Sequence, residues 1–357
     1  MSKLFGIIST DMGIDLGTAN TRVCVRGKGV VFNEPSVVAV KKGTHEVLLG
    51  GGAVGRAAKE MLGRTPLSID VVRPLKDGVV ADFDMTEALL AYFIRRVQNR
   101  RHWRRRWLGP RIVINVPSGI TAVEKRAVFN ATERAGARKV YLVEEPRAAG
   151  LGAGLPIHEA RASMIVDIGG GTTDIAVLSL GDVVVSAGLK VAGDAMNEAI
   201  VQYLHRDYNI LVGQNTAEEI KIRVGSACDG YDEEMPDGGV MEVKGRDLLA
   251  GVPRAITVTA AEVREAISGP VAQIIELIRT TLEKTGPELS GDLLDRGMTL
   301  CGGGVLLRGL ARVVHEETGL PVRVADDPMG TVVRGTGVFL EHLDEFKSIL
   351  ESAEDEL

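Results

Sequence analysis

A short glycine-rich run between two apolar runs carries the strongest chemical signal in the chain. Residues 163–177 read S-M-I-V-D-I-G-G-G-T-T-D-I-A-V. The first apolar run predicts a buried strand ending near Asp167, and the glycines permit a tight turn with backbone close to a ligand. The hydroxyls of Thr172 and Thr173 and the nearby N–H groups would then suit a phosphate. Asp167 would hold a phosphate-bound Mg²⁺, directly or through water. The alternative is a plain β-hairpin with a glycine turn.

The same pattern occurs near the start of the chain. Residues 12–25 read M-G-I-D-L-G-T-A-N-T-R-V-C-V, with Asp15 in the place of Asp167. Two copies about one domain apart predict two similar halves whose turns grip one phosphate chain, with both aspartates beside the metal. A third glycine run, residues 302–304, follows an apolar strand-like segment and would suit a flat ring such as adenine. The three turns together favour a nucleotide site over unrelated hairpins.

Length and composition limit the class of protein to which these turns can belong. The chain has 357 residues, 25% charged and 45% hydrophobic, with a net charge of −6. This length predicts two domains, and the acidic balance argues against nucleic-acid binding. The three cysteines lack metal-type spacing, so a reducing cytoplasm is expected. Cys24 and Cys301 are interpreted as small core residues.

Two segments could contact a membrane surface, although no apolar run reaches the length of about 20 residues that spans a bilayer. The N-terminal M-S-K-L-F-G-I-I-S-T is either a weak surface anchor or an ordinary terminus, and it lacks the features of a signal peptide. Residues 95–106 contain seven arginines, among them Arg104 and Arg105, and both tryptophans, Trp103 and Trp107, lie in or beside this run. Arginine favours anionic headgroups and tryptophan favours the interface. The alternative is a solvated arginine loop with inward-packed tryptophans.

Helix-start signals place several further elements. Thr121-x-x-Glu124 and Thr216-x-x-Glu219 each match a capping box, in which the glutamate reaches back to the cap N–H. Asp194 is expected either to cap the helix that follows it or to approach a ligand. A last helix is expected over residues 338–350.

The order of the turns resembles the superfamily of actin, the sugar kinases and the seventy-kilodalton heat-shock chaperones. The resemblance to the bacterial MreB family is much closer and covers nearly the whole chain. It is carried by D-L-G-T-A-N-T, N-E-P-S-V-V-A-V, R-P-L-K-D-G-V-V-A-D-F, V-P-S-G-I-T-A-V-E, E-E-P-R-A-A-G-L-G-A-G-L-P, D-I-G-G-G-T-T-D, V-A-G-D, A-E-E-I-K, R-G-M-T-L-C-G-G-G and A-D-D-P, in family order. The chain departs from the family pattern at Asp174, Arg147 and Cys301.

The resemblance implies an α/β fold of the actin-like ATPase type, with two similar domains, each carrying a smaller subdomain, and a nucleotide cleft between them. Domain I would cover residues 1–150, with its subdomain at about 38–77. Domain II would cover residues 151–357, with its subdomain at about 191–245. The implied cofactors are ATP and Mg²⁺.

The resemblance also implies roles for individual residues. Asp15 and Asp167 would position the metal, and Glu124 with Thr173 would orient the attacking water, so that the catalytic and capping roles compete for the Glu124 side chain. The nucleotide would be bound by Thr18, Ala19, Asn20, Gly169, Gly170, Gly171, Thr172, Gly193, Asp194, Glu218, Glu219, Ile220, Lys221, Gly302, Gly303, Gly304 and Val305. The membrane contact would be made by Trp103, Trp107, Arg104 and Arg105.

The implied function is an ATPase that polymerises into filaments on the inner face of the cytoplasmic membrane and guides peptidoglycan synthesis to maintain a rod shape. Its implied partners are other copies of the chain, the membrane surface and membrane proteins of cell-wall elongation. The main alternative is a small-molecule kinase on the same fold, for which the sequence offers no separate substrate constellation. A chaperone would need a peptide-binding domain after the ATPase, and a non-hydrolysing scaffold is a third alternative, given Asp174 and Arg147.

Overall fold

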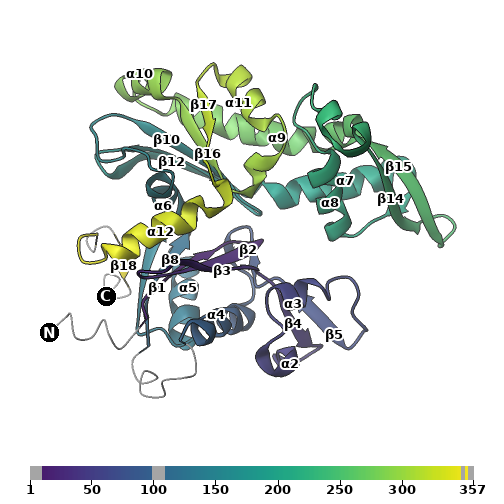
Figure 1. Cartoon of the computed structure of the whole chain (residues 1–357), viewed down its shortest axis with the longest axis horizontal. Coiled ribbons are helices and arrows are strands. Elements are labelled where there is room, and N and C mark those ends of the chain that lie inside the picture. The colour runs from purple at the N-terminus through teal and green to yellow at the C-terminus, as the bar shows by residue number, and fades with distance from the viewer. Residues whose placement is uncertain (1–9, 99–108, 347–349, 353–357) are drawn as a thin grey trace. The chain divides into compact units, whose positions relative to one another are not determined.

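The computed structural model describes residues 10–98, 109–346 and 350–352, and its chain forms two compact units (Figure 1). The first unit is Met1–His158 with Met329–Leu357, and the second is Glu159–Pro328. This division differs from the expected second domain of residues 151–357, because the chain from Met329 onward belongs to the first unit. The predicted mixed α/β fold is confirmed.

The first unit is built on a six-stranded sheet in the order β18-β9-β8-β1-β2-β3. The chain enters through an antiparallel meander of three strands, and two strands then extend the sheet in parallel with β1. The strands are β1 (Met12–Leu16), β2 (Asn20–Val25), β3 (Gly29–Pro35), β8 (Arg111–Val116), β9 (Lys139–Glu144) and the short β18 (Glu351–Ser352).

Helices cover this sheet, and a small two-stranded sheet follows β3. The apolar positions of α4 are buried with those of β1 and β8 in one core, with Phe93 fully enclosed. The helices are α4 (Phe83–Val97), α5 (Ala122–Arg134), α6 (Glu145–Gly152) and α12 (Thr331–Glu341). The smaller part contains β4 (Val38–Lys41), α2 (Leu48–Gly51), α3 (Arg56–Lys59), β5 (Ile69–Val72), β6 (Leu75–Lys76) and β7 (Val79–Val80).

The second unit repeats the topology of the first. Its main sheet has the order β12-β11-β10-β16-β17, in which β10, β11 and β12 are antiparallel and β16 and β17 extend the sheet in parallel with β10. The strands are β10 (Ser163–Ile168), β11 (Thr173–Ser179), β12 (Asp182–Leu189), β16 (Met298–Cys301) and β17 (Val322–Val324). The two copies of the sequence pattern therefore occupy matching strands of matching sheets.

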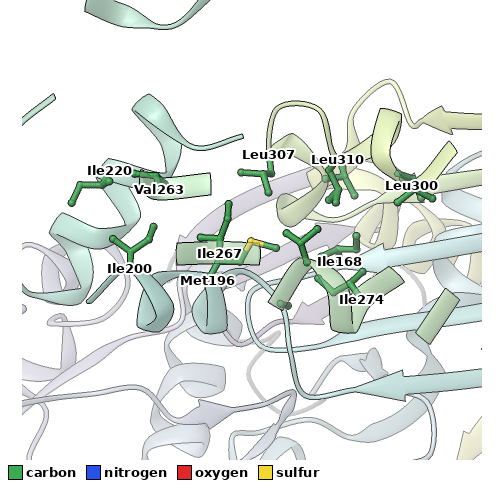
Figure 2. Packing of buried hydrophobic residues seen from close by; sticks show 14 of the residues in the cluster. Ile168, Met196, Ile200, Ile220, Val263, Ile267, Ile274, Leu300, Leu307 and Leu310 are labelled. Carbon is green, nitrogen blue, oxygen red and sulfur yellow. The ribbon is translucent and has the colours of Figure 1, made fainter. Parts of the chain in front are cut away.

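Most of the second unit shares one hydrophobic core (Figure 2). Figure 2 shows Met196 and Ile200 of α7 and Ile267 of α9 in this core, together with Leu300 of β16. The remaining elements are α7 (Gly193–Tyr208), β13 (Ile210–Leu211), α8 (Gln214–Val224), β14 (Val240–Asp247), β15 (Pro253–Thr259), α9 (Ala260–Glu283), α10 (Pro287–Arg296), η4 (Gly303–Leu306) and α11 (Leu310–Thr318).

Two helix starts and the last helix differ from the sequence-based expectation. The predicted Thr216 capping box is wrong, because the N-cap of α8 is Gly213, three residues earlier, and the helix begins at Gln214. Asp194 is not an N-cap, because Ala192 holds that position in α7. The last long helix is α12, which ends at Glu341, so the helix expected over residues 338–350 is largely wrong.

Candidate functional site

The two aspartate-bearing hairpins have the same register. In the first, Leu16 pairs with Thr21 across the turn, and in the second Ile168 pairs with Thr173, so both turns have the same length. Directly opposite Asp15 lies Arg22, and the matching position opposite Asp167 is Asp174. Side chains at opposed positions of antiparallel strands lie on the same face. The hairpins are therefore equivalent in backbone and different in charge.

The first turn is fixed by groups from later in its own unit. Ser36 donates its hydroxyl to the carbonyl of Gly17 at 2.6 Å, and its N–H donates to the carbonyl of Ala19 at 3.0 Å. The Thr18 hydroxyl oxygen accepts the N–H of Gly78 at 2.9 Å. A side chain at Gly17 would come within 2.8 Å of the carbonyl oxygen of Asn20, so the close turn requires glycine. The hydroxyl proton of Thr18 remains able to donate to an anion.

Asp15 is a buried carboxylate with limited compensation. Its side chain is 9% exposed, and its ion-pair contact is Arg22 Nη1 to Asp15 Oδ2 at 3.4 Å. Burial raises the pKa of Asp15 to about 6, even though the Arg22 charge and hydrogen bond lower it. By contrast, Asp11 in the same unit receives the backbone N–H of Arg111 at 3.1 Å and two guanidinium N–H groups. A buried carboxylate with one long contact is typical of a functional site.

The second turn is held against the start of α7. The N–H of Gly169 donates to the carbonyl of Thr172 at 2.8 Å and closes the hairpin. The N–H groups of Gly193 and Asp194 donate to the carbonyls of Gly169 and Gly170, at 3.3 and 2.7 Å. Gly193 and Asp194 therefore lie beside the second turn, and their approach to a nucleotide stays a prediction.

Lys221 of α8 joins the same cluster. Its Nζ donates to the carbonyl of Gly193 at 2.7 Å. Burial lowers the pKa of Lys221, while the charges of Glu218 and Asp194 act in the opposite direction. Two other predicted residues of α8 lie in different environments. Ile220 is in the hydrophobic core, whereas Glu219 is exposed beside Arg223.

The third glycine run lies against the end of β10. Asp167 pairs with Cys301 in parallel register, and a side chain at Gly302 would come within 2.2 Å of Asp167 Oδ1. Gly302 has φ +85°, a conformation that glycine adopts without strain. Gly303, Gly304 and Val305 then form the start of η4, and Gly304 approaches Ile168. Within the second unit, the turn, the start of α7, Lys221 and the third glycine run are therefore neighbours.

Glu124 makes the capping box that the sequence pattern predicts. Its Oε2 accepts the N–H and the hydroxyl of Thr121, both at 2.8 Å, and its own N–H donates to the Thr121 hydroxyl at 3.2 Å. Glu124 follows the carboxyl end of β8, which runs parallel to β1, so its loop and Asp15 are at the same edge of the sheet.

Thr173 is fully buried at the base of the second turn. Its hydroxyl donates to the carbonyl of Val191 at 2.8 Å. This bond joins the start of β11 to the segment before α7, and a role for Thr173 in orienting water stays a prediction. The two core cysteines are confirmed, since Cys24 is 2% exposed and Cys301 is fully buried.

The predicted membrane-contact residues Trp103, Trp107, Arg104 and Arg105 lie outside the described residues. Across residues 10–98, 109–346 and 350–352, no helix combines the length and the hydropathy needed to cross a bilayer.

The residues around each turn, taken by itself, have donor chemistry that fits a phosphate-bound Mg²⁺. Asp15 and Asp167 are 6% and 8% exposed, and each lies one residue before the end of its strand, beside a turn rich in N–H groups. Carboxylate oxygens are the protein ligands that Mg²⁺ prefers, usually together with phosphate oxygens and water. Because Gly302 has no side chain, there is space beside the Asp167 carboxylate that a side chain would fill, and backbone atoms line this space.

Three residues of the first turn were missed by the sequence reasoning. Ser36 and Gly78 hold the turn from a distance, and no local pattern marks them. Arg22 could have been found, because a hairpin with a turn of this length places the residue seven positions after Asp15 directly opposite it.

Comparison with known proteins shows the family of the chain and confirms its fold. The sequence model of the family "MreB/Mbl protein" matches residues 9–348. The chain is 48% identical to the cell shape-determining protein MreB of Escherichia coli strain K12 over 344 residues, which cover 96% of this chain and 97% of that protein. It is also 48% identical to the cell shape-determining protein Mbl of Bacillus subtilis strain 168 over 339 residues, covering 95% and 98% of the two chains.

Solved structures are similar over the same extent. MreB5 of Spiroplasma citri bound to ADP has a TM-score of 0.86 and 36% identity, covering 95% of this chain and 98% of that one. A MamK double helical filament has a TM-score of 0.75 and 26% identity, covering 94% and 99%. The predicted actin-like fold is confirmed, and the chain belongs to the MreB/Mbl family of actin-like, cell shape-determining proteins.

Proposed function

We propose that this protein binds ATP with Mg²⁺ and hydrolyses it. The observation that carries the proposal is the cluster in the second unit, where the Gly169–Gly170 backbone meets the start of α7 and the half-buried ammonium of Lys221. Backbone N–H groups, a helix N-terminus and a lysine are the usual means of binding phosphate. The proposal is also supported by relatives whose structures contain ADP or AMPPNP.

Each turn has a defined part in this proposal. Thr18, Ala19 and Asn20 in the first unit and residues 169–172 in the second donate hydrogen bonds to phosphate oxygens. Asp15 and Asp167 position Mg²⁺, which neutralises charge on the phosphates when it is bound. Residues 302–305 and the face of α8 with Glu218 and Lys221 accommodate the nucleoside. Glu124 orients the attacking water, with Thr173 fixing the base of the second turn.

We further propose that nucleotide binding is coupled to self-assembly. A head-to-tail contact that does not close into a ring produces a filament, and a related chain is solved as a double helical filament. The filaments would lie on the inner face of the cytoplasmic membrane, with the arginine- and tryptophan-rich residues 95–107 at its surface. There they would guide peptidoglycan synthesis through membrane proteins of cell-wall elongation, in keeping with the shape-determining role of the relatives.

One pair of measurements tests the proposal. Purified protein is incubated with Mg²⁺ and ATP, phosphate release is followed in solution, and the same mixture is imaged by electron microscopy on an anionic lipid monolayer. We expect phosphate release without any added acceptor, and filaments on the lipid that require nucleotide. Formation of ADP that begins only when a small-molecule acceptor is added, with the phosphoryl group transferred to that acceptor and without filaments, would instead favour the kinase alternative. No binding of ATP at all would refute the proposal.

A further inference from the structure

The carboxyl end of α8 is held by an arginine from a later part of the second unit. The helix ends at Val224, and Gly225 follows it with extended backbone. The last carbonyl groups of a helix have no partners inside the helix. Arg308 supplies one here, because its Nη1 donates to the carbonyl of Ile222 at 2.9 Å and to that of Gly225 at 3.4 Å. A cation at this end of a helix is also favoured by the helix dipole.

The backbone of Arg308 holds the same segment a second time. Its carbonyl accepts the N–H of Ala227 at 2.7 Å, and Arg308 pairs with the fully buried Ser226 in a parallel β-bridge. Arg308 lies two residues after η4, where the N–H of Leu307 donates to the carbonyl of Gly304 at 3.1 Å. One residue therefore joins the end of α8 to the third glycine run through both its side chain and its backbone.

Each of the two joined segments has its own contact with the second turn or with the strand before it. Lys221 of α8 donates its Nζ to the carbonyl of Gly193, which lies next to the turn. In the third glycine run, a side chain at Gly304 would come within 2.4 Å of Ile168 at the end of β10. Leu307 and Ile168 lie in the same hydrophobic core (Figure 2). Arg308 is thus a direct link between two elements that otherwise meet through the turn and the core.

The contacts that shape the second turn itself do not involve Arg308. The N–H of Gly169 closes the turn on Thr172, and the N–H groups of Gly193 and Asp194 donate to carbonyls of the turn. Loss of the Arg308 side chain would leave these bonds in place and would remove a link between α8 and residues 302–305. Those are the two elements to which the proposed function assigns the nucleoside. The loss should therefore affect the binding of the nucleoside more than that of the phosphates.

We propose that Arg308 is a positioning residue for nucleoside recognition, which holds the end of α8 and the third glycine run at the spacing that the base and the ribose require. Arg308 acts through Lys221 and residues 302–305, since its own N–H groups donate to carbonyls of the α8 end. This inference rests on the proposed function, because it concerns the nucleoside part of the same site. It involves residues of the second unit alone.

The experiment compares a ligand that contains the nucleoside with one that lacks it. ADP and inorganic pyrophosphate, each with Mg²⁺, are titrated calorimetrically into the full chain and its variants. Arg308→Met removes the guanidinium and keeps an unbranched side chain, so we expect ADP affinity to fall by roughly tenfold, the scale of one hydrogen bond from a charged donor. Pyrophosphate affinity should be unchanged. Arg308→Lys keeps a donor and a positive charge at the helix end and should recover much of the ADP affinity.

Arg312→Met is the matched control. Arg312 lies four residues further along, in α11, where it donates to the carbonyl of Asp229 and stacks on the ring of Tyr231. It thus holds the same loop after α8 without a contact to the helix end itself. Its loss should leave the affinities for ADP and pyrophosphate unchanged, even if the thermal midpoint falls as far as in Arg308→Met.

Hydrogen exchange on the unaltered protein gives a test that depends on no variant. The N–H of Gly225 donates to the carbonyl of Lys221, and that of Ala227 donates to the carbonyl of Arg308. Exchange of such amides requires local opening. If Arg308 links the two segments, ADP should slow exchange at both amides together with exchange across residues 302–308. Pyrophosphate should slow exchange mainly at the second turn.

Three outcomes would overturn the inference while leaving the proposed function intact. They are an Arg308→Met protein that binds ADP as tightly as the unaltered protein, equal losses of ADP and pyrophosphate affinity in that variant, and slowed exchange at residues 302–308 that does not extend to Gly225 and Ala227. If Arg308→Met does not fold, or if pyrophosphate binds too weakly to be measured, the exchange experiment decides. Failure of the unaltered protein to bind ADP would refute the proposed function and remove the inference with it.

Discussion

At the residue scale, Glu124 has a capping role and a proposed catalytic role, which a single substitution cannot separate. Its Oε2 closes the capping box with Thr121, and a lost cap costs about 1 kcal/mol of stability. We expect Glu124→Ala to preserve ATP affinity and to slow phosphate release by roughly tenfold or more, because the water loses an orienting group. Phosphate release and the thermal midpoint are measured on the same preparation.

Thr121→Ala supplies the comparison that isolates the cap. It removes the same capping box from the other side while the Glu124 carboxylate remains. If its thermal midpoint falls as far as that of Glu124→Ala but phosphate release is unchanged, the two roles are separate. If phosphate release is slowed equally in both variants, Glu124 has only a structural role.

The cysteines should differ in reactivity according to their burial. Burial raises the pKa of Cys24 to about 11, so little thiolate is present near pH 8, and Cys301 is fully enclosed. Cys228 is partly exposed. We expect an aromatic disulfide reagent to modify one thiol rapidly in the native protein and three after denaturation. Rapid modification of Cys24 in the native protein, identified by mass spectrometry, would contradict the burial of this strand.

Much of the residue-level site followed from sequence because local spacing determined it. Asp15 and Asp167 lie next to the last residue of their strands, and the number of residues between the paired strands sets the length of each turn. The pairing of Asp15 with Arg22 needed the hairpin register, and the contact of Lys221 with Gly193 joins residues of two separate helices. Contacts of the second kind depend on tertiary packing and leave no local pattern.

At the element scale, α12 packs on α6 through glycines at very close range. A side chain at Gly335 would come within 1.7 Å of the carbonyl oxygen of Ala148, and one at Gly152 within 1.8 Å of the carbonyl oxygen of Thr331. The helices can approach this closely only because both positions lack a side chain. The sequence reasoning missed α12 because it placed the last helix several residues too late, at the apolar residues beyond these glycines.

This packing predicts opposite effects for two glycines of one helix. Gly335→Ala forces backbone apart and should destabilise the protein by about 2 kcal/mol or more. At Gly337 the added carbon would lie 3.7 Å from Cys24 Sγ, an ordinary contact, and alanine favours the helix by up to about 1 kcal/mol. Thermal midpoints without nucleotide should therefore fall for Gly335→Ala and hold or rise for Gly337→Ala. The reverse order would show that the two helices do not pack in this way.

At the scale of the whole molecule, each copy of the repeated hairpin lies in a unit of its own, and the main sheets of the two units have the same topology. The repeat was visible in sequence because both copies retain the aspartate and the glycine turn. The division of the chain was less visible, since residues after Pro328 rejoin the first unit. A segment that completes a distant sheet has no signal in its own composition, because its apolar positions suit any core.

The association with membrane is the property of the whole filament that the sequence predicts most directly. We expect Trp103→Ala with Trp107→Ala to reduce pelleting with anionic vesicles by roughly tenfold, since two aromatic rings no longer enter the interface. Arg104→Ala with Arg105→Ala should instead remove part of the dependence on anionic lipid and on salt, because each arginine contributes roughly 1 kcal/mol of attraction that salt screens.

Two controls separate membrane binding from assembly. Both double variants should form filaments with nucleotide in the absence of lipid, and both should pellet weakly with neutral vesicles. If the tryptophan variant pellets with anionic vesicles to the same extent as the unaltered protein, the proposed membrane contact through residues 95–107 is contradicted. Because many copies in one filament would bind the surface together, a small loss of affinity per copy would be multiplied along its length, and filaments should therefore show the difference more clearly than monomers.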